Sequence, residues 1–311
     1  MDASSAELVV VGRACAEYMA RGSWLPKSGE TVDATSFEAT LGGWGARQAV
    51  AAARLERLVA LVTPIGADDR AECLLRWLGA EAVDTRLVRR DEKTSSGAAL
   101  VQVGPHGARQ RMVFPEAGRA VGQLDVEAAA DAIARARGLL LSLELPPAVA
   151  QRAIMLAREA GVRVLLDTTG ATTPSAELLR AVDVVHVTPR ETELLIGVRV
   201  LGPATARTAG EALAARGPGA VVLEAGADGH RVATERGSRL FPRLGVPEAD
   251  DEIAAEAFVA GLAVGLVEAR SLDDASILAS AARALVSAEQ GVRAFPRRDA
   301  VLRLLEASTR R

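Results

Sequence analysis

The stretch from Asp250 to Leu266 constrains this chain most, because it joins a group of acidic residues to a helical run of small and apolar residues. Its carboxylates come from Asp250, Asp251, Glu252 and Glu256. The pattern predicts a loop that leads into a buried helix, with Glu256 at the position where the helix begins. Backbone N–H groups without acceptors collect at such a point and favour an anion. If the protein does chemistry, we expect it here.

The composition limits the kind of protein. The chain has 311 residues, 49% of them hydrophobic, which allows a sizeable buried core. Lys and Arg total 37 against 40 Asp and Glu without a basic block, so we expect no nucleic-acid partner. Cys15 and Cys73 are too few for a disulfide framework and fit a reducing cytosol. No signal-peptide pattern opens the chain, and no run approaches about 18 apolar residues. We expect a cytoplasmic protein without a membrane span.

Apolar strand patterns alternate with helical patterns along most of the chain. Strands are expected at residues 8–11, 58–63, 85–88, 139–143, 162–166, 182–187 and 220–223. Helices are expected at 46–55, 67–78, 125–137, 147–160, 205–216, 254–269, 273–288 and 299–307. Because these strands are apolar throughout, they predict a mainly parallel sheet with helices on both faces.

Other segments depart from this alternation. Residues 13–40 carry a looser pattern, in which only 31–35 alternates like an exposed strand. Two hairpins are expected, from residues 96–103 with 109–114 and from 229–234 with 238–241. The simplest partition is a single α/β domain over residues 1–311, with a β-sheet lid formed by about 17–40 and 96–114.

In sheets of this kind, ligands bind beyond the carboxyl ends of the strands. The residues that follow the expected strands are therefore the candidates for a site. They are Arg13 to Glu17, Gly42 to Arg47, Glu144, Asp167, Arg190 to Glu193, Glu224 to Gly229 and the stretch that begins at Asp250.

Short motifs over almost the whole chain resemble those of ribokinase-like (PfkB-type) sugar and nucleoside kinases. They are Val10-Val11-Gly12, Ser28-Gly29-Glu30-Thr31, Gly42-Gly43-Trp44-Gly45-Ala46-Arg47-Gln48-Ala49, Gly66-Ala67-Asp68-Asp69, Thr188-Pro189-Arg190-Glu191-Thr192-Glu193, Gly226-Ala227-Asp228-Gly229 and Glu256-Ala257-Phe258-Val259-Ala260-Gly261. The resemblance implies a three-layer α/β/α, Rossmann-like domain with a small β-sheet lid that often serves dimerisation. It also implies transfer of the γ-phosphoryl group of ATP, with Mg²⁺, to a sugar hydroxymethyl group.

The resemblance is incomplete in the opening stretch. When Phe258 is aligned with the family motif, Asp250 matches its leading Asp and marks a weak monovalent-cation position. Ile253 and Ala255 replace its glycines, and Glu256 replaces its catalytic Asp. A Cβ restricts the backbone conformations that glycine allows, so we expect the anion hole not to form in the family's way.

The ligand positions differ as well. On the substrate side, Cys15 and Glu17 stand where the family commonly has Asn and Asp, and Arg47 replaces another Asn. The expected substrate-binding set is Cys15, Glu17, Gly42, Gly43, Arg47 and Glu144. On the nucleotide side, Arg190 replaces an Asn, Glu224 replaces a Thr, and Glu193 remains as a possible Mg²⁺ ligand. The expected nucleotide and anion set is Arg190, Glu193, Glu224, Gly226, Gly229 and Ala255.

Each substitution has a functional and a structural interpretation. Glu256 is a relocated general base or a carboxylate that only stabilises a helix N-terminus. Arg47 and Arg190 are new anion sites or members of structural ion pairs. Without a Cys/His cluster, His186 and His230 are interpreted as structural residues and not as metal ligands.

Two functional hypotheses follow. The first is a sugar-kinase homologue that has lost most phosphotransferase activity and acts as a small-ligand-binding or regulatory protein. The alternative is a divergent ATP-dependent sugar or nucleoside kinase, in which Glu256 is the base and Arg47 selects an anionic sugar derivative. Both allow a homodimer through the lid.

Overall fold

The computed structural model describes residues 6–105, 108–170, 174–244, 251–286 and 291–309. Its strands are β1 (Leu8–Val11), β2 (Cys15–Gly22), β3 (Ala34–Gly42), β4 (Val59–Gly66), β5 (Val88–Asp91), β6 (Gly97–Val103), β7 (Arg109–Phe114), β8 (Gly138–Ser142), β9 (Arg163–Asp167), β10 (Val184–Val187), β11 (Ala220–Glu224), β12 (His230–Thr234) and β13 (Gly237–Phe241).

The helices alternate with these strands. They are α1 (Trp44–Arg54), α2 (Asp69–Ala80), α3 (Glu116–Arg119), α4 (Gln123–Ala128), α5 (Ala130–Arg135), α6 (Pro147–Glu159), α7 (Ala176–Arg180), α8 (Pro189–Ile196), α9 (Pro203–Ala214), α10 (Asp251–Val267), α11 (Leu272–Ala284) and α12 (Arg298–Thr309). Two 3₁₀ turns, η3 (Gly226–Asp228) and η4 (Gly291–Ala294), complete the described elements.

Nine strands form the central sheet in the order β13-β12-β11-β10-β9-β8-β1-β4-β5. The strands from β11 to β5 run parallel to one another, whereas β12 and β13 are added antiparallel at one edge. The predicted parallel sheet is therefore confirmed, and the hairpin over residues 230–241 forms its antiparallel end.

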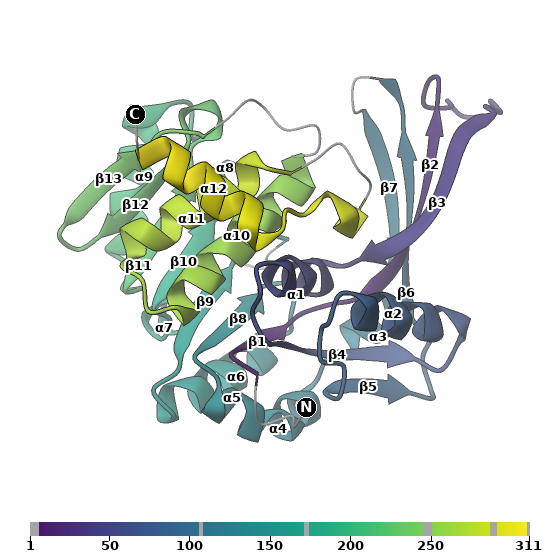
Figure 1. Cartoon of the computed structure of the whole chain (residues 1–311), viewed down its shortest axis with the longest axis horizontal. Coiled ribbons are helices and arrows are strands. Elements are labelled where there is room, and N and C mark those ends of the chain that lie inside the picture. Colours follow the sequence, from purple (N-terminus) through teal and green to yellow (C-terminus); the bar gives the residue numbers. More distant parts are fainter. Residues whose placement is uncertain (1–5, 106–107, 171–173, 245–250, 287–290, 310–311) are drawn as a thin grey trace.

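Alternate residues of each strand enter two separate apolar cores. In β1, Leu8 and Val10 join a core with α1, α2, α10, α11 and α12, whereas Val9 and Val11 join a core with helices α4 to α9. Figure 1 shows the resulting three layers, with the sheet between the two groups of helices. The predicted α/β fold with helices on both faces is confirmed.

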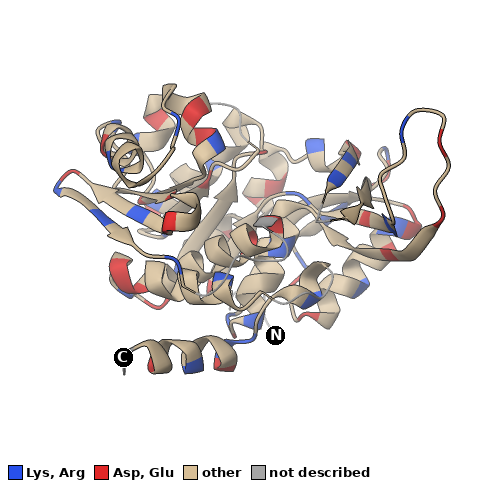
Figure 2. Ribbon diagram, turned by 90° about the horizontal axis from the view of Figure 1, so that it is seen from above, with Lys and Arg blue, Asp and Glu red and all other residues tan. Residues whose placement is uncertain are grey.

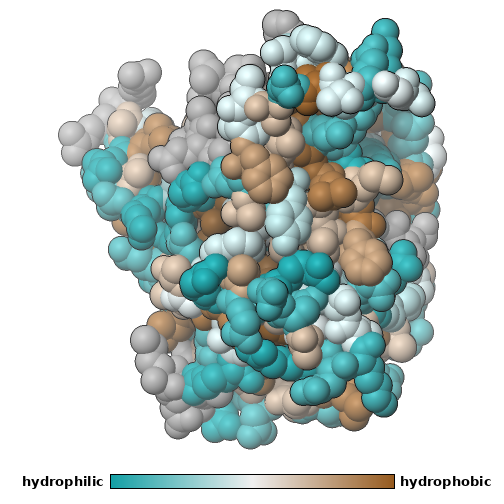
Figure 3. Space-filling model, turned by 90° about the vertical axis from the view of Figure 1, so that its right-hand side faces the viewer, coloured by the Kyte–Doolittle hydropathy of each residue, from teal (hydrophilic) through white to brown (hydrophobic). Residues whose placement is uncertain are grey.

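The second sheet has four strands in the order β3-β2-β6-β7 and stands beside the central sheet (Figure 1). One face carries Cys15 and Glu17 towards the central sheet. The opposite face carries apolar side chains that are half or more exposed, namely Phe37, Leu100, Met112 and Phe114. Figure 3 looks onto this side and shows apolar side chains among hydrophilic ones. This sheet is the lid of the fold, while the partition into one domain with lid bounds 17–40 and 96–114 stays a prediction.

Some boundaries differ from those predicted. The segment with the loose pattern contains two long strands, Cys15–Gly22 and Ala34–Gly42, whose alternation is hidden because both faces carry mixed residues. The expected helix over residues 125–137 is broken into α4 and α5. Among the described residues, no helix is long and apolar enough to cross a membrane. Figure 2 shows acidic and basic residues interspersed along the ribbon, as the balanced composition predicts.

Candidate active site

A pocket of about 430 Å³ lies between the lid and the carboxyl ends of the central strands. Its walls come from the loops after β1, β8 and β9, the start of α1, the lid strands β2, β6 and β7, helix α3 and the first turn of α10. The lining residues are Arg13, Ala14, Cys15, Glu17, Gly43, Trp44, Arg47, Ala99, Arg111, Val113, Pro115, Arg119, Leu143, Glu144, Gly170 and Glu252. This volume suits a small ligand.

Arg47 lies at the centre of a group of charges, which we call the Arg47 cluster: Glu17, Arg47 and Glu256, which are buried, and Arg111 and Glu252, whose side chains are partly exposed. The Arg47 side chain is 3% exposed. Its Nη2 lies 2.5 Å from Glu17 Oε2, and its Nη1 lies 3.3 Å from Glu256 Oε1. Its Nε donates to the carbonyl oxygen of Leu41 at 3.3 Å. Every nitrogen of the guanidinium group therefore has a protein partner, and the structural interpretation of Arg47 is favoured over a free anion site.

Two carboxylates of this cluster are not fully hydrogen-bonded. Glu17 Oε1 and Glu256 Oε2 are buried, and neither has a hydrogen-bond partner among the described residues. Burial raises the pKa of Glu256 well above its usual value, nearby Glu252 and Glu17 raise it further, and Arg47 opposes them. A buried polar atom without a partner is costly, so these two oxygens are positions where a ligand hydroxyl group would be stabilised.

The lid is tied to α10 by a second arginine of the same cluster. Arg111 of β7 donates through both terminal nitrogens to the carboxylate of Glu252, with Nη2 at 2.6 Å from Oε2. Arg111 also lies 3.6 Å from Glu17. The pKa of Glu252 is lowered, because Arg111 and Arg47 outweigh its burial. Glu252 therefore serves as an ion-pair partner and is a poor proton acceptor.

The far wall of the pocket holds Arg13 and Glu144. The backbone N–H of Arg13 donates to Glu144 Oε1 at 2.9 Å, and Arg13 Nη2 donates to the carbonyl oxygen of Glu144 at 2.5 Å. Burial raises the pKa of Glu144, although Arg13 opposes this. Cys15 lies beside them, and burial raises the pKa of its thiol to about 12, so it is a neutral wall residue.

Two glycines shape the pocket by close approach. Gly43 has a φ of 90°, and a Cβ at this position would lie 2.5 Å from the carbonyl oxygen of Arg13. Gly170 has a φ of 77°, and its Cβ would lie 2.1 Å from the ring of Trp44. Both positions therefore require glycine. Trp44 packs against the backbone at Gly170 and presents its ring to the pocket.

The nucleotide-side candidates lie at the carboxyl ends of β10 and β11. Arg190 and Glu193 are exposed on α8, and Glu193 lies 3.4 Å from Arg199. Gly226 and Gly229 line a cavity of about 10 Å³, together with His230, Arg243, Arg283 and others. A cavity of this volume has room for about one water molecule.

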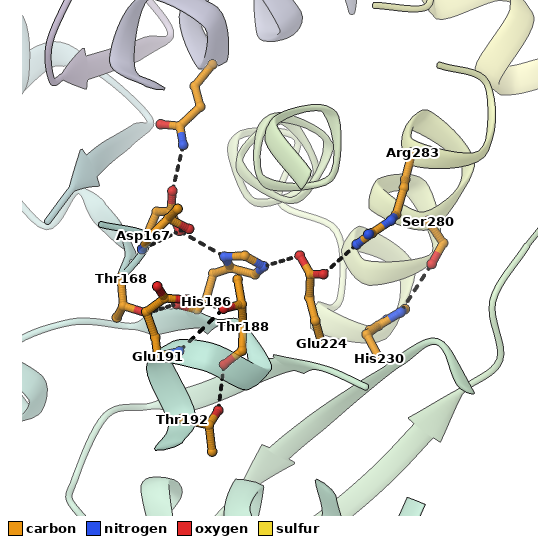
Figure 4. A network of polar contacts seen from close by, with 12 residues as sticks. Asp167, Thr168, His186, Thr188, Glu191, Thr192, Glu224, His230, Ser280 and Arg283 are labelled. Carbon is orange, nitrogen blue, oxygen red and sulfur yellow. Dashed lines mark hydrogen bonds and ion pairs between the residues drawn. The ribbon is translucent and has the colours of Figure 1, made fainter. Parts of the chain in front are cut away.

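Glu224 belongs to a buried chain of polar contacts, which we call the His186 chain: Gln48, Asp167, His186, Glu224 and Arg283. Figure 4 labels the last four of these residues. Gln48 Nε2 donates to Asp167 Oδ2 at 2.7 Å, and Asp167 Oδ1 lies 2.9 Å from His186 Nδ1. His186 Nε2 lies 3.1 Å from Glu224 Oε1, and Arg283 Nη1 donates to Glu224 Oε2 at 2.7 Å. The chain connects α1 to α11 across the ends of three parallel strands.

The charges of the His186 chain support one another. Burial lowers the pKa of His186, but Asp167 and Glu224 outweigh it and raise this pKa to about 9. Burial raises the pKa of Glu224, but Arg283 and His186 outweigh it and lower this pKa to about 2. His186 is therefore an imidazolium between two carboxylates at neutral pH. The prediction that His186 has a structural role agrees with this placement.

Comparison with known proteins identifies the family. The sequence profile of the pfkB family carbohydrate kinases matches residues 5–298. The chain belongs to this pfkB family. The "Ribokinase" of Haemophilus influenzae is 29% identical over 300 residues, which cover 96% of this chain and 98% of that protein. The "Deoxyribokinase" of Salmonella typhi is 28% identical over 261 residues, which cover 81% of this chain and 83% of that protein.

Solved structures agree with the fold of this pfkB-family chain. The ribokinase of Arabidopsis thaliana complexed with ribose and ATP superposes with a TM-score of 0.86 and 26% identity, over 97% of this chain and 99% of that one. The ribokinase of Cryptococcus neoformans in complex with ADP superposes with a TM-score of 0.79 and 19% identity, over 96% of this chain and 99% of that one. The predicted ribokinase-like fold with a lid is confirmed.

The start of α10 is the clearest correction to the pfkB-based expectations. The helix begins at Asp251, more than one turn before Glu256, and the prediction that it begins at Glu256 is wrong. Ile253 and Ala255 explain the difference, because they lack the backbone freedom of the family's glycines and propagate the helix. The N–H groups of Ala254 and Ala255 are consequently intrahelical donors. Asp250 lies outside the described residues.

The structure gathers most of the predicted substrate-side residues in this pfkB-family site. Cys15, Glu17, Gly43, Arg47 and Glu144 line the pocket, and Gly42 packs behind Cys15 and Glu17. Glu256 does not line it but adjoins it through Arg47. Their roles as ligands stay predictions, as do those of Arg190, Glu193, Glu224, Gly226, Gly229 and Ala255.

Sequence reasoning missed several residues that line the pocket. Arg111, Arg119 and Gly170 carry no motif of the pfkB family, and Glu252 was noted only as one of the acidic residues. The alternation of β7 gives the one available signal, because Arg109, Arg111 and Val113 share a strand face. Nothing in the sequence indicates which face turns towards the pocket.

Proposed function

We propose that this protein is an ATP-dependent kinase that phosphorylates a hydroxyl group of a small, hydroxyl-rich substrate bound beneath the lid. The observation that supports this most is the 430 Å³ pocket, because its wall residue Arg47 contacts the carboxylate of Glu256, whose pKa is raised and whose Oε2 has no hydrogen-bond partner among the described residues. The relatives named above are kinases, so they favour this function over the predicted loss of activity. The predicted pseudokinase has no support from them.

In the proposed reaction, Glu256 accepts the proton of the attacking hydroxyl group. The hydroxyl oxygen bonds to the γ-phosphorus of ATP as the bond from that phosphorus to the β,γ-bridging oxygen breaks, which leaves ADP and a phosphorylated substrate. A raised pKa suits a general base that works near neutral pH. Glu17 Oε1 offers a second acceptor, which would orient a neighbouring hydroxyl group.

On the nucleotide side, ATP would have to bind on the solvent-exposed surface beside η3, because the cavity there is too small to hold it. Gly226 leaves open space where a Cβ would lie, and Arg243 beside it carries positive charge for the phosphates. The space left by Gly229 is taken up by the carbonyl oxygen of Phe241, and Arg283 is paired with Glu224. The 10 Å³ cavity between these residues is too small for a base or a phosphate. Mg²⁺ typically keeps several waters and uses one or two carboxylates with substrate phosphates, so Glu193 is a sufficient protein ligand. The ion would neutralise phosphate charge when bound.

The test is turnover by the purified protein with ATP, Mg²⁺ and a panel of aldoses, deoxyaldoses, sugar acids and nucleosides. We expect ADP release with at least one of them. Glu256→Gln should lower kcat by about 10²- to 10⁴-fold, because it removes the base. Glu193→Gln should raise the Mg²⁺ requirement and leave substrate binding unchanged. Full activity of the Glu256→Gln variant would refute the role of Glu256.

A second candidate function is a ligand-binding protein without turnover, which keeps the regulatory hypothesis open. It is favoured by one observation, namely that Glu256 Oε1 already bonds Arg47 while α10 begins at Asp251. Phosphate charge then has fewer free backbone N–H groups to bind. If calorimetry detects a sugar ligand but no Mg²⁺-dependent binding of ATP or ADP, this function replaces the kinase.

We also propose that the outer face of the lid joins two copies of the chain. Phe37, Leu100, Met112 and Phe114 are apolar and 50–74% exposed on this face. Burying them against a second lid removes apolar surface from water. Met112→Glu should shift the protein towards the monomer in analytical ultracentrifugation, whereas Met155→Glu, at an exposed position on α6, serves as the control. An unchanged sedimentation coefficient for Met112→Glu would contradict the lid dimer.

A further inference from the structure

The arginines that line the pocket are not all paired with carboxylates of the described residues. Arg47 and Arg111 are paired with carboxylates of the Arg47 cluster, and Arg13 is paired with Glu144. Arg119 also lines the pocket and is exposed, but it makes no hydrogen bond or ion pair with any residue in the described part of the chain. The pocket therefore presents one positive charge, that of Arg119, which no residue in the described part of the chain neutralises.

A second donor lies near Arg119. Arg13 Nε is buried and has no hydrogen-bond partner within the described ranges, since Glu144 Oε2 lies 3.7 Å away. The stem of Arg13 packs against the backbone next to Arg119, because a Cβ at Gly118 would lie 3.1 Å from Arg13 Cγ and Cδ. The end of the pocket at α3 thus offers donors that lack acceptors.

The end at α10 has the opposite character. There, Glu17 Oε1 and Glu256 Oε2 are acceptors that lack donors among the described residues. The two ends are well separated, because Arg111 contacts Glu252 at the α10 end and the five residues from Arg111 to Pro115 span about 13 Å of chain towards α3. A ligand that satisfies both ends must donate hydroxyl protons at one end and accept from guanidinium groups at the other.

We propose that the pocket binds a polyhydroxylated carboxylic acid, with its hydroxyl groups at the α10 end and its carboxylate held by Arg119 and Arg13 at the α3 end. The assignment rests on the proposed function only in placing the reacting hydroxyl group beside Glu256. It replaces Arg47 as the residue that selects an anion, because Arg47 has no free nitrogen. One unpaired guanidinium matches one carboxylate, and the planar fork of Arg fits it bidentately.

A phosphate group is the other source of negative charge, and it fits this end less well. It carries a second charge that Arg119 alone does not balance. It would also face the carboxylate of Glu144, which lies in the same wall. The Glu144 carboxylate would repel the doubly charged phosphate more strongly than a singly charged carboxylate, so a sugar acid is favoured over a sugar phosphate.

Calorimetric binding without ATP tests this inference separately from catalysis. The ligands are D-ribonate with D-ribose and D-gluconate with D-glucose, so that each acid has a neutral counterpart, together with D-ribose 1-phosphate. We expect at least one acid to bind about ten- to a hundredfold more tightly than its aldose. Arg119→Gln should abolish that ratio without changing the Kd of the aldose. Arg207→Gln, an exposed arginine on α9, should leave both values unchanged.

The possible outcomes separate the two proposals. If the acid binds through Arg119 but no phosphate is transferred, the substrate class stands and the kinase fails. If a neutral sugar is phosphorylated and Arg119→Gln changes neither KM nor Kd, the proposed kinase activity is supported and the proposed sugar-acid ligand is refuted. Tighter binding of D-ribose 1-phosphate than of either acid, or no binding of any acid, also overturns the inference. In an active enzyme, Arg119→Gln should raise KM for the acid about tenfold and leave kcat unchanged.

Discussion

The Arg47 cluster and the His186 chain are both buried charge systems on α1 and its neighbours, but they are completed to different degrees. In the His186 chain, both nitrogens of His186 and both carboxylate oxygens of Glu224 have partners. In the Arg47 cluster, one oxygen of Glu17 and one of Glu256 have none among the described residues. The His186 chain crosses the ends of β9, β10 and β11, and the Arg47 cluster borders the pocket. In the His186 chain the unpaired buried atom is Oε1 of the neutral Gln48, whereas in the Arg47 cluster the unpaired atoms belong to carboxylates. The comparison teaches that carboxylate oxygens without partners beside a cavity mark the site, whereas carboxylates with partners on both oxygens mark the scaffold.

Arg47→Met should give the largest effect, because it leaves two carboxylates buried without their cation. We expect the free energy of unfolding at pH 7 to fall by about 3–5 kcal/mol in urea denaturation. The double variant Arg47→Met, Glu256→Gln should recover part of the loss, since it removes one of those charges. A loss below about 1 kcal/mol for the single variant would mean that water or relaxation compensates these carboxylates.

Alkaline pH should weaken the His186 chain selectively. The pKa of His186 in the folded protein, about 9, lies above its ordinary value of 6.5. Its contribution is therefore fully present below pH 6.5 and is lost as the pH rises through 9, by on the order of 3 kcal/mol. Urea denaturation between pH 6 and about 10 should show this decline, and His186→Gln, although less stable at neutral pH, should show a flatter profile. Equal slopes in both proteins would contradict a charged His186.

Gln48→Ala tests the end of the His186 chain that lies next to Arg47 in the sequence. It removes the donor to Asp167 and leaves that carboxylate buried with one contact fewer. We expect a loss of about 1–3 kcal/mol in the free energy of unfolding, with ligand binding preserved. Gln48→Glu, of nearly equal volume, should destabilise more because two carboxylates then meet. A loss of ligand binding without a loss of stability would assign Gln48 to the site instead.

Arg111→Gln should have the smallest effect on stability, at about 0.2–1 kcal/mol, because the Arg111 and Glu252 side chains are both 27% exposed. Its effect should appear in ligand binding, since this ion pair joins lid strand β7 to α10 beside the pocket. We expect a raised Kd or KM together with a nearly unchanged unfolding midpoint. Arg239→Gln, which breaks a surface pair with Asp273, is the matched control.

The sequence by itself determined the layered fold and the ends of strands where a site forms. All-apolar strands such as Leu8–Val11 and Ala220–Glu224 fit only a sheet that is covered on both faces. Their positions after the expected strands placed Glu17, Arg47 and Glu144 at one edge of that sheet, and the structure brings them to one pocket. Local patterns suffice here because periodicity is a short-range property that tertiary packing seldom reverses.

Only the tertiary structure decided how these charges are paired. Arg47 and Glu256 are 209 positions apart, and no local pattern indicates that their side chains meet. The same holds for Arg111 with Glu252, because lid orientation decides which face of β7 turns inward. It holds also for Arg119 on α3, which has no partner among the described residues, because only the packing of α3 beside the lid brings it to the pocket. Asp250 to Leu266 first suggested an anion site at Glu256, whereas the fold begins the helix at Asp251 and gives Glu256 an arginine partner. A carboxylate acquires its pKa and role from burial and neighbours, which exist only once distant segments have packed together.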